Sequence, residues 1–190
     1  KLNKQYMAAV MASGAAVGSA AAFPGIGTLI AMSAVAGETV VFLEATAVYV
    51  LAVAEVHGIP ADHRERRRAL VLAVLVGDDS KHAVAELLGP GRTSGAWMSD
   101  GAATLPLPAV AQLNNRLLKF FVKKYTLKRG AMMFGKMLPV GIGAVVGGVG
   151  NRMMGKKIIA NAERAFGSPP VRWPSPLHLL PAPAPDRAAE

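Results

Sequence analysis

Two glutamates and two histidines are the side chains of the N-terminal half whose types and spacing could do chemistry. Glu44 and Glu55 interrupt an apolar stretch, where an acid is either a paired core residue or a functional group. We expect Glu44 to be a paired core residue, although an enzyme acting on lipids could use it as a buried carboxylate. His57 and His63 flank a turn near Asp62 and could join an N/O metal site. Their spacing matches no recognised metal motif, so helix-end histidines are the simpler interpretation.

The motifs of the common enzyme classes are absent from the sequence. There is no cysteine, which excludes a thiol nucleophile and a disulfide framework. There is no HExxH or GxSxG motif, and the segment Gly155-Lys156-Lys157 lacks the glycine spacing and the Ser/Thr of a phosphate-binding loop. We therefore expect no catalytic residue, no metal and no cofactor, and a role outside catalysis.

The charge distribution is the most informative global property. The chain of 190 residues has 21 Lys and Arg against 12 Asp and Glu, and its net charge is +9. Residues 1–100 carry eight bases and nine acids, whereas residues 101–162 carry ten bases and no acid. Such a one-sided segment indicates a partner of opposite charge: anionic lipid, nucleic acid or an acidic protein.

An amphipathic helix over about 108–129 would present many of these bases. Helical geometry places Leu117, Leu118 and Phe121 opposite Lys119 and Lys123. Such a helix lies on a membrane surface, binds a partner groove, or packs on a core with a solvated basic face. Phe120, Phe121 and Tyr125 resemble a core stripe rather than a base-stacking platform, so nucleic acid is not the expected partner. The predicted lipid- or anion-binding residues are Arg116, Lys119, Lys123, Lys124, Lys128, Arg129, Arg66 and Arg67.

The rest of the chain is organised around an uncharged stretch from Tyr6 to Gly37. Pro24 interrupts this stretch, which predicts two helices, 7–22 and 28–37, joined by a Pro-Gly turn. Each helix is shorter than the roughly 20 residues that span a bilayer. The pattern predicts either a shallowly inserted or re-entrant hairpin, or a core hairpin of a soluble fold.

A second stretch, Leu138 to Ala144, repeats the scheme of an apolar residue, Pro and Gly-Ile-Gly. The repetition predicts either an internal duplication or two hairpins that pack together. Glycines four residues apart, such as Gly14 and Gly18, would share one helix face and allow close helix packing. The predicted turn residues are Pro24, Gly25, Gly27, Pro139, Gly141 and Gly143.

Further helices are predicted over 38–57, 59–77, about 80–88 and 151–166. Glu38 would favour the first turn of the helix over 38–57, and Gly58 and Gly77 would end the first two of these helices. Residues 89–104 are rich in Gly, Ser and Thr and predict a loop between halves of about 1–88 and 105–167. Residues 168–190 contain seven prolines and predict a disordered tail.

Several segments together resemble the EcsC protein family. They are Pro24-Gly25-Ile26-Gly27, Ala54 to Gly58, Glu65 to Leu70, and the closing blocks Leu138 to Gly141, Gly147 to Arg152 and Ala162 to Phe166. The resemblance covers most of residues 10–167. We interpret residues 1–167 as one EcsC-like domain that is short for the family at its N-terminus. It implies a helical, often membrane-associated protein without established catalytic residues, named after an operon that encodes an ABC transporter.

The sequence thus predicts an all-α bundle of six to eight helices with two Pro/Gly-turned hydrophobic hairpins. We expect a non-enzymatic protein on the cytoplasmic side of a membrane, with anionic lipid as its partner and an accessory role in transport or secretion. A membrane protein complex or a homo-oligomer is a further expected partner. The alternative is a soluble helical module that binds an acidic protein or nucleic acid.

Overall fold

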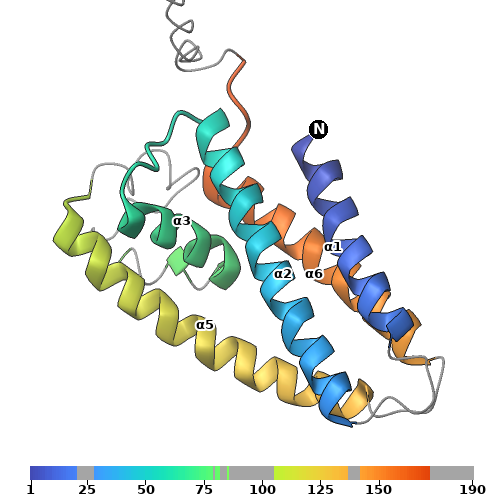
Figure 1. The fold of residues 1–190 in the computed structure, drawn as a ribbon. Coiled ribbons are helices and arrows are strands. Elements are labelled where there is room, and N and C mark those ends of the chain that lie inside the picture. The colour runs from blue at the N-terminus through green and yellow to red at the C-terminus, as the bar shows by residue number, and fades with distance from the viewer. Residues whose placement is uncertain (21–27, 79, 82–84, 86–104, 137–141, 172–190) are drawn as a thin grey trace, which may run out of the picture.

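The computed structural model is all-helical in the part of the chain that it describes (Figure 1). It describes residues 1–20, 28–78, 80–81, 85, 105–136 and 142–171, and within these it describes side chains outside 16–36 and 124–149. Five helices make up this part: α1 (Leu2–Ala20), α2 (Thr28–Val56), α3 (Arg64–Val76), α5 (Leu107–Lys136) and α6 (Ile142–Phe166). The all-α prediction is confirmed, whereas the expected count of six to eight helices is not.

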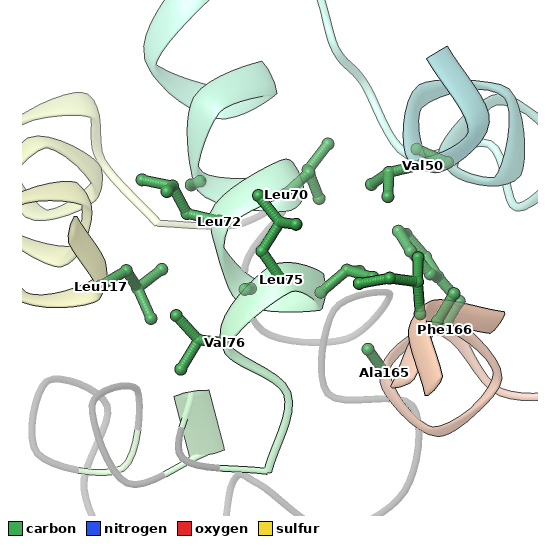
Figure 2. Close-up of a cluster of buried hydrophobic side chains, with 14 of the residues drawn as sticks. Val50, Leu70, Leu72, Leu75, Val76, Leu117, Ala165 and Phe166 are labelled. Carbon is green, nitrogen blue, oxygen red and sulfur yellow. The ribbon is translucent and has the colours of Figure 1, made fainter. Parts of the chain in front are cut away.

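The helices form two packed groups that share a core. In one group α1 lies against both α2 and α6, and in the other α3 lies against α5. Figure 2 shows α3 between α5 and the first group, with Leu72 and Val76 directed toward Leu117 of α5 and Leu70 and Leu75 on the side of Val50 and Phe166. Leu117 is fully buried, and Phe166 is 1% exposed. The run of apolar residues in α3 is buried because helices cover it on both sides.

Glycines end three of the helices, and the sequence predicts two of these ends. Gly58 follows α2 with φ 67°, and the pair of bonds from Gly58 N to Glu55 O (3.0 Å) and from Ile59 N to Ala54 O (3.0 Å) makes a complete Schellman motif. Gly77 follows α3 with φ 75° and donates to Ala73 O. Gly167 follows α6 with φ 81°.

Four predicted helix boundaries are wrong. A single helix, α2, covers the predicted segments 28–37 and 38–57 and passes through Gly37. Helix α3 begins at Arg64 rather than near Pro60, because the Schellman turn after α2 directs Ile59 into the core, where it is 5% exposed. Helix α5 continues through Gly130 to Lys136, and α6 begins at Ile142. Where a helix passes through a glycine, packing outweighs the roughly 1 kcal/mol that the glycine costs.

Both predicted turns connect helix ends that gather at one end of the molecule. The last residues of α1 and α5 and the first residues of α2 and α6 lie together at the lower right of Figure 1. Of these helices, α1 packs on α2 and α6, and α6 also contacts α2 and α5. The turn residues Pro24, Gly25, Gly27, Pro139 and Gly141 lie outside the described residues, while Gly143 lies in the first turn of α6. The loop 89–104 and residues 172–190 of the tail also lie outside them.

Candidate functional site

The end at which the four helix termini gather is built from the two uncharged segments of the sequence. Residues 5–37 supply most of α1 and the beginning of α2, and residues 137–151 supply the beginning of α6. We call this region the uncharged end: residues 11–20 of α1, 28–37 of α2 and 142–150 of α6. Among the described helices, α5 is the one that carries charged residues to this end of the molecule. These residues are all basic, and they are Lys124, Lys128, Arg129 and Lys136 in the last turns of α5.

A buried polar cluster closes the inner boundary of the uncharged end. The Glu38 side chain is 6% exposed and accepts a hydrogen bond from Asn151 Nδ2 at 2.8 Å. Asn151 Nδ2 also lies 3.4 Å from Val10 O, so this amide joins α6 to both α1 and α2. Gly14 makes room for it, because a Cβ at that position would overlap Asn151 Nδ2 and lie 3.0 Å from Asn151 Cγ. Gly14 therefore makes room for a side chain of α6, while the side-chain environment of Gly18 lies outside the described residues.

A second polar network joins the opposite half of α1 to α2 and α6. The Tyr6 and Tyr49 rings stack with their centroids 4.5 Å apart, and the Tyr6 hydroxyl bonds to Thr46 Oγ1 at 2.8 Å. The Tyr49 hydroxyl donates to Asn3 Oδ1 (2.8 Å), and Asn3 Nδ2 donates to Glu163 Oε1 (3.1 Å). Burial, and secondarily the nearby Glu163 carboxylate, raise the pKa of Tyr49 to about 12. The phenol therefore stays protonated and acts as a donor.

A groove of about 420 Å³ runs along the surface between α1 and α2. Its walls are Leu2, Gln5, Tyr6 and Ala9 from α1 and Val41, Glu44, Ala45, Val48, Tyr49 and Ala52 from α2. The volume lies in the range of ligand sites, and the lining is mostly apolar. Glu44 is the carboxylate among the lining residues, and it is exposed. The prediction of Glu44 as a paired core residue is wrong, since the outer face of α2 is left uncovered by the other described helices.

The outer face of α5 combines exposed lysines with exposed apolar side chains. Lys119 and Lys123 are exposed, one turn apart. Phe120 (42% exposed) and Val122 (52% exposed) lie on the two flanks of this lysine pair. We call these four residues the α5 outer face. The placement of Phe120 in the core stripe is wrong, because α3 covers only the opposite face of the helix.

The core stripe of α5 otherwise follows the prediction. Leu117 is buried, and Leu118 and Phe121 are partly buried and pack against the core. The helix therefore has the predicted amphipathic division along the part whose side chains the structure describes.

The other predicted anion-binding residues have different surroundings. Arg116 is half-buried, and the side chains of Lys124, Lys128 and Arg129 lie outside the described ones. Arg66 is half-buried and donates to Leu105 O at 3.2 Å, so it ties α3 to the segment before α5. Arg67 is exposed and lies 3.4 Å from Ala61 O.

The histidine pair is not assembled into a metal site. Nδ1 of His57 bonds to Val53 O at 2.8 Å, and its ring tilts against the Phe166 ring at a centroid distance of 5.5 Å. His63 is exposed at the start of α3, and Glu55 is exposed on α2. Within the described ranges, no three His, Cys, Asp or Glu side chains gather closely enough to hold a metal ion.

The sequence analysis did not predict that Glu38 is buried, and it placed Glu38 in the first turn of a helix, whereas Glu38 lies in the middle part of α2. A signal was present, since Glu38 shares one helix face with Phe42, Thr46 and Tyr49 at spacings of four, four and three residues. All four side chains are buried. The acid inside the fold is therefore Glu38, and the acid on the surface is Glu44.

No protein-family model, curated protein or solved structure matches this chain. One helical segment of the described chain, Gly37–Val56, is long and apolar enough to cross a membrane, with a mean hydropathy of 1.8. Only 28% of its most apolar window is buried by the rest of the fold. Val40, Val41 and Val48 are the large apolar side chains of this segment that the other described helices leave exposed.

Proposed function

We propose that this chain is a non-enzymatic, membrane-associated helical protein that enters the lipid interface with its uncharged end. The observation that carries the proposal is the meeting of two uncharged, Ala- and Gly-rich segments, far apart in the sequence, at one end of the fold (Figure 1). An end without charge loses little electrostatic hydration when it leaves water. The buried Glu38–Asn151 pair marks the depth at which charged residues begin along α2 and α6.

Helix α5 supplies the attraction to anionic headgroups. Its bases run from the outer face into the last turns beside the uncharged end, and each base near an anionic membrane contributes about 1 kcal/mol. Exposed Phe120 and Val122 add apolar area beside the lysines, an arrangement typical of surfaces that lie in a membrane interface. Anionic lipid on the cytoplasmic leaflet is the partner that fits this combination.

Interfacial binding fits the fold better than a transmembrane orientation of α2. Glu44 and Glu55 are both exposed on the segment Gly37–Val56. A carboxylate at the centre of a bilayer costs several kcal/mol unless a partner compensates it. The uncharged end precedes Glu38 along α2, so it enters lipid without burying either exposed acid. An accessory role in transport or secretion, as the resemblance to the EcsC family implies, is part of this proposal.

Vesicle flotation tests the proposal directly. The wild-type chain should float with vesicles of phosphatidylcholine and phosphatidylserine, should be released by high salt, and should bind pure phosphatidylcholine weakly. Replacing both Lys119 and Lys123 by Gln removes about 2 kcal/mol of membrane-binding free energy and should weaken binding to anionic vesicles about 30-fold.

The matched control is the double replacement of Arg64 and Arg68 by Gln on α3. Both arginines are exposed, and the change in net charge is the same. We expect this control to retain most of the affinity, because its position is outside the α5 surface. If both double variants bind anionic vesicles equally well, net charge alone explains the binding. If the wild-type chain binds neutral and anionic vesicles equally well, the role of α5 is refuted. A chain that binds neither kind of vesicle would favour the soluble interaction module.

A further inference from the structure

We propose that the protein self-associates head to tail, with the α5 outer face of one copy packed in the α1–α2 groove of the next. The groove is a concave apolar surface with one carboxylate, Glu44, beside Val41 and Val48. Val48 is 66% exposed and Val41 is 48% exposed. Contiguous exposed apolar side chains at such a surface are typical of an interaction site. The occupant that fits must be apolar and carry a positive charge.

The α5 outer face has this chemistry. Phe120 offers an aromatic side chain to an apolar groove, and the flanking Lys119 and Lys123 each place an ammonium group within reach of a carboxylate beside it. A helix that lays an apolar face in a groove is a common mode of recognition. Pairing a lysine with Glu44 would also give a charged partner to the acid, because the described lining of the groove contains no cation.

The charges favour a contact between the two different surfaces over a contact of either surface with its own copy. Two grooves that face each other across a two-fold axis would bring Glu44 against Glu44, and two α5 outer faces would bring lysines against lysines. Like charges placed together across an interface oppose association. Of these three contacts, only the one between groove and α5 outer face joins opposite charges.

The fold places the two surfaces so that one copy can use both. Helix α5 runs along the lower left side of the molecule in Figure 1 and α1 lies at its right edge, with α2 and α6 between the middle of α5 and α1. The α5 outer face is directed away from α3, which covers the opposite side of the helix, where Leu113 and Leu117 are buried. A head-to-tail contact of this kind produces a closed ring or an open chain of copies.

Sedimentation velocity of the full chain in detergent-free and lipid-free buffer tests this inference. The wild-type protein should show a mass that rises with concentration in the micromolar range, as expected of a small transient interface with Kd of about 1 µM. Glu44→Lys should weaken the association at least about tenfold, and so should the double variant Lys119→Glu/Lys123→Glu. All three positions are exposed, so these variants should keep the fold.

The decisive sample is an equimolar mixture of the two charge variants. In the mixture, Lys119 and Lys123 of the Glu44→Lys variant meet the intact Glu44 of the double variant. The carboxylates introduced on α5 of the double variant meet the ammonium group introduced at position 44 of the other. Association should therefore return in the mixture although each variant alone associates weakly.

The matched control is Glu55→Lys, which makes the same charge change on α2 outside the groove lining and should leave association unchanged. Three results would overturn the inference: a wild-type chain that stays monomeric, a mixture that does not recover association, or a Glu55→Lys variant as weak as Glu44→Lys. Failure here is distinguishable from failure of the membrane proposal. Glu44 lies outside the uncharged end and the α5 outer face, so Glu44→Lys should lose self-association while it still binds anionic vesicles.

Discussion

Gly14 gives the sharpest test of how α1 packs on α6. A Cβ at position 14 would overlap the Asn151 amide, so Gly14→Ala must push this side chain away from Glu38. Loss of a hydrogen bond to a buried charged group costs about 1.5–3 kcal/mol. The change also brings a gain, because Ala exceeds Gly by about 1 kcal/mol in helix propensity. The net expectation is a loss of about 0.5–2 kcal/mol in the free energy of unfolding.

The matched controls are Gly37→Ala and Gly150→Ala. A Cβ at either position meets no atom within 4 Å, so only the helix-propensity gain remains. Both controls should raise the free energy of unfolding by about 0.5–1 kcal/mol. Urea denaturation followed by circular dichroism measures all three variants. If Gly14→Ala stabilises the protein as much as the controls do, the close approach of α1 and α6 through Asn151 is refuted.

Two further predictions concern the tyrosine network and the core. Because folding raises the pKa of Tyr49 from 10.0 to about 12, its contribution to stability is fully present below pH 10 and is lost as the pH rises through 12. Urea titrations across this range should show that the free energy of unfolding of the wild type falls by about 1–2 kcal/mol, which is less than the full shift implies because solvent partly screens the hydroxyl. The profile of Tyr49→Phe should be flatter, and identical profiles would contradict the assignment. Leu117→Ala should cost about 2–5 kcal/mol, because Leu117 is fully buried between α5 and α3 (Figure 2). The exposed Val122→Ala is its control, and a loss at Leu117 no larger than the loss at Val122 would contradict this core.

The sequence predicts the elements of this fold better than their boundaries. Apolar periodicity identifies the segments that become α3 and α5, and Gly58 and Gly77 mark helix ends because each takes a positive φ. Gly37 and Gly130 look like similar breaks, yet α2 and α5 pass through them. Local propensity does not contain the packing of the rest of α2 and α5, which carries each helix through its glycine, so this difference could not be predicted from spacing alone.

The burial of the acids was the hardest feature to predict. Glu38 and Glu44 both interrupt apolar sequence, and they differ in the face of α2 that they occupy. Asn151, which bonds to Glu38, is 113 residues away, and no local pattern indicates that pairing. The α5 lysines were predicted as a surface from spacing, because α5 is amphipathic, but the exposure of Phe120 depends on how far α3 covers the helix.

The central claim is that the uncharged end enters the lipid interface. Because the chain has no cysteine, a polarity-sensitive fluorophore can be attached at one introduced cysteine. Ala15→Cys places it on α1 in the uncharged end, and Ala160→Cys places it far along α6, where both original side chains are exposed. When the protein binds anionic vesicles, the emission maximum of the fluorophore at position 15 should shift to the blue. The emission maximum of the fluorophore at position 160 should stay at the value that it has for the protein free in water. A shift at 160 without one at 15, or bound protein with no shift at either position, would contradict the claim.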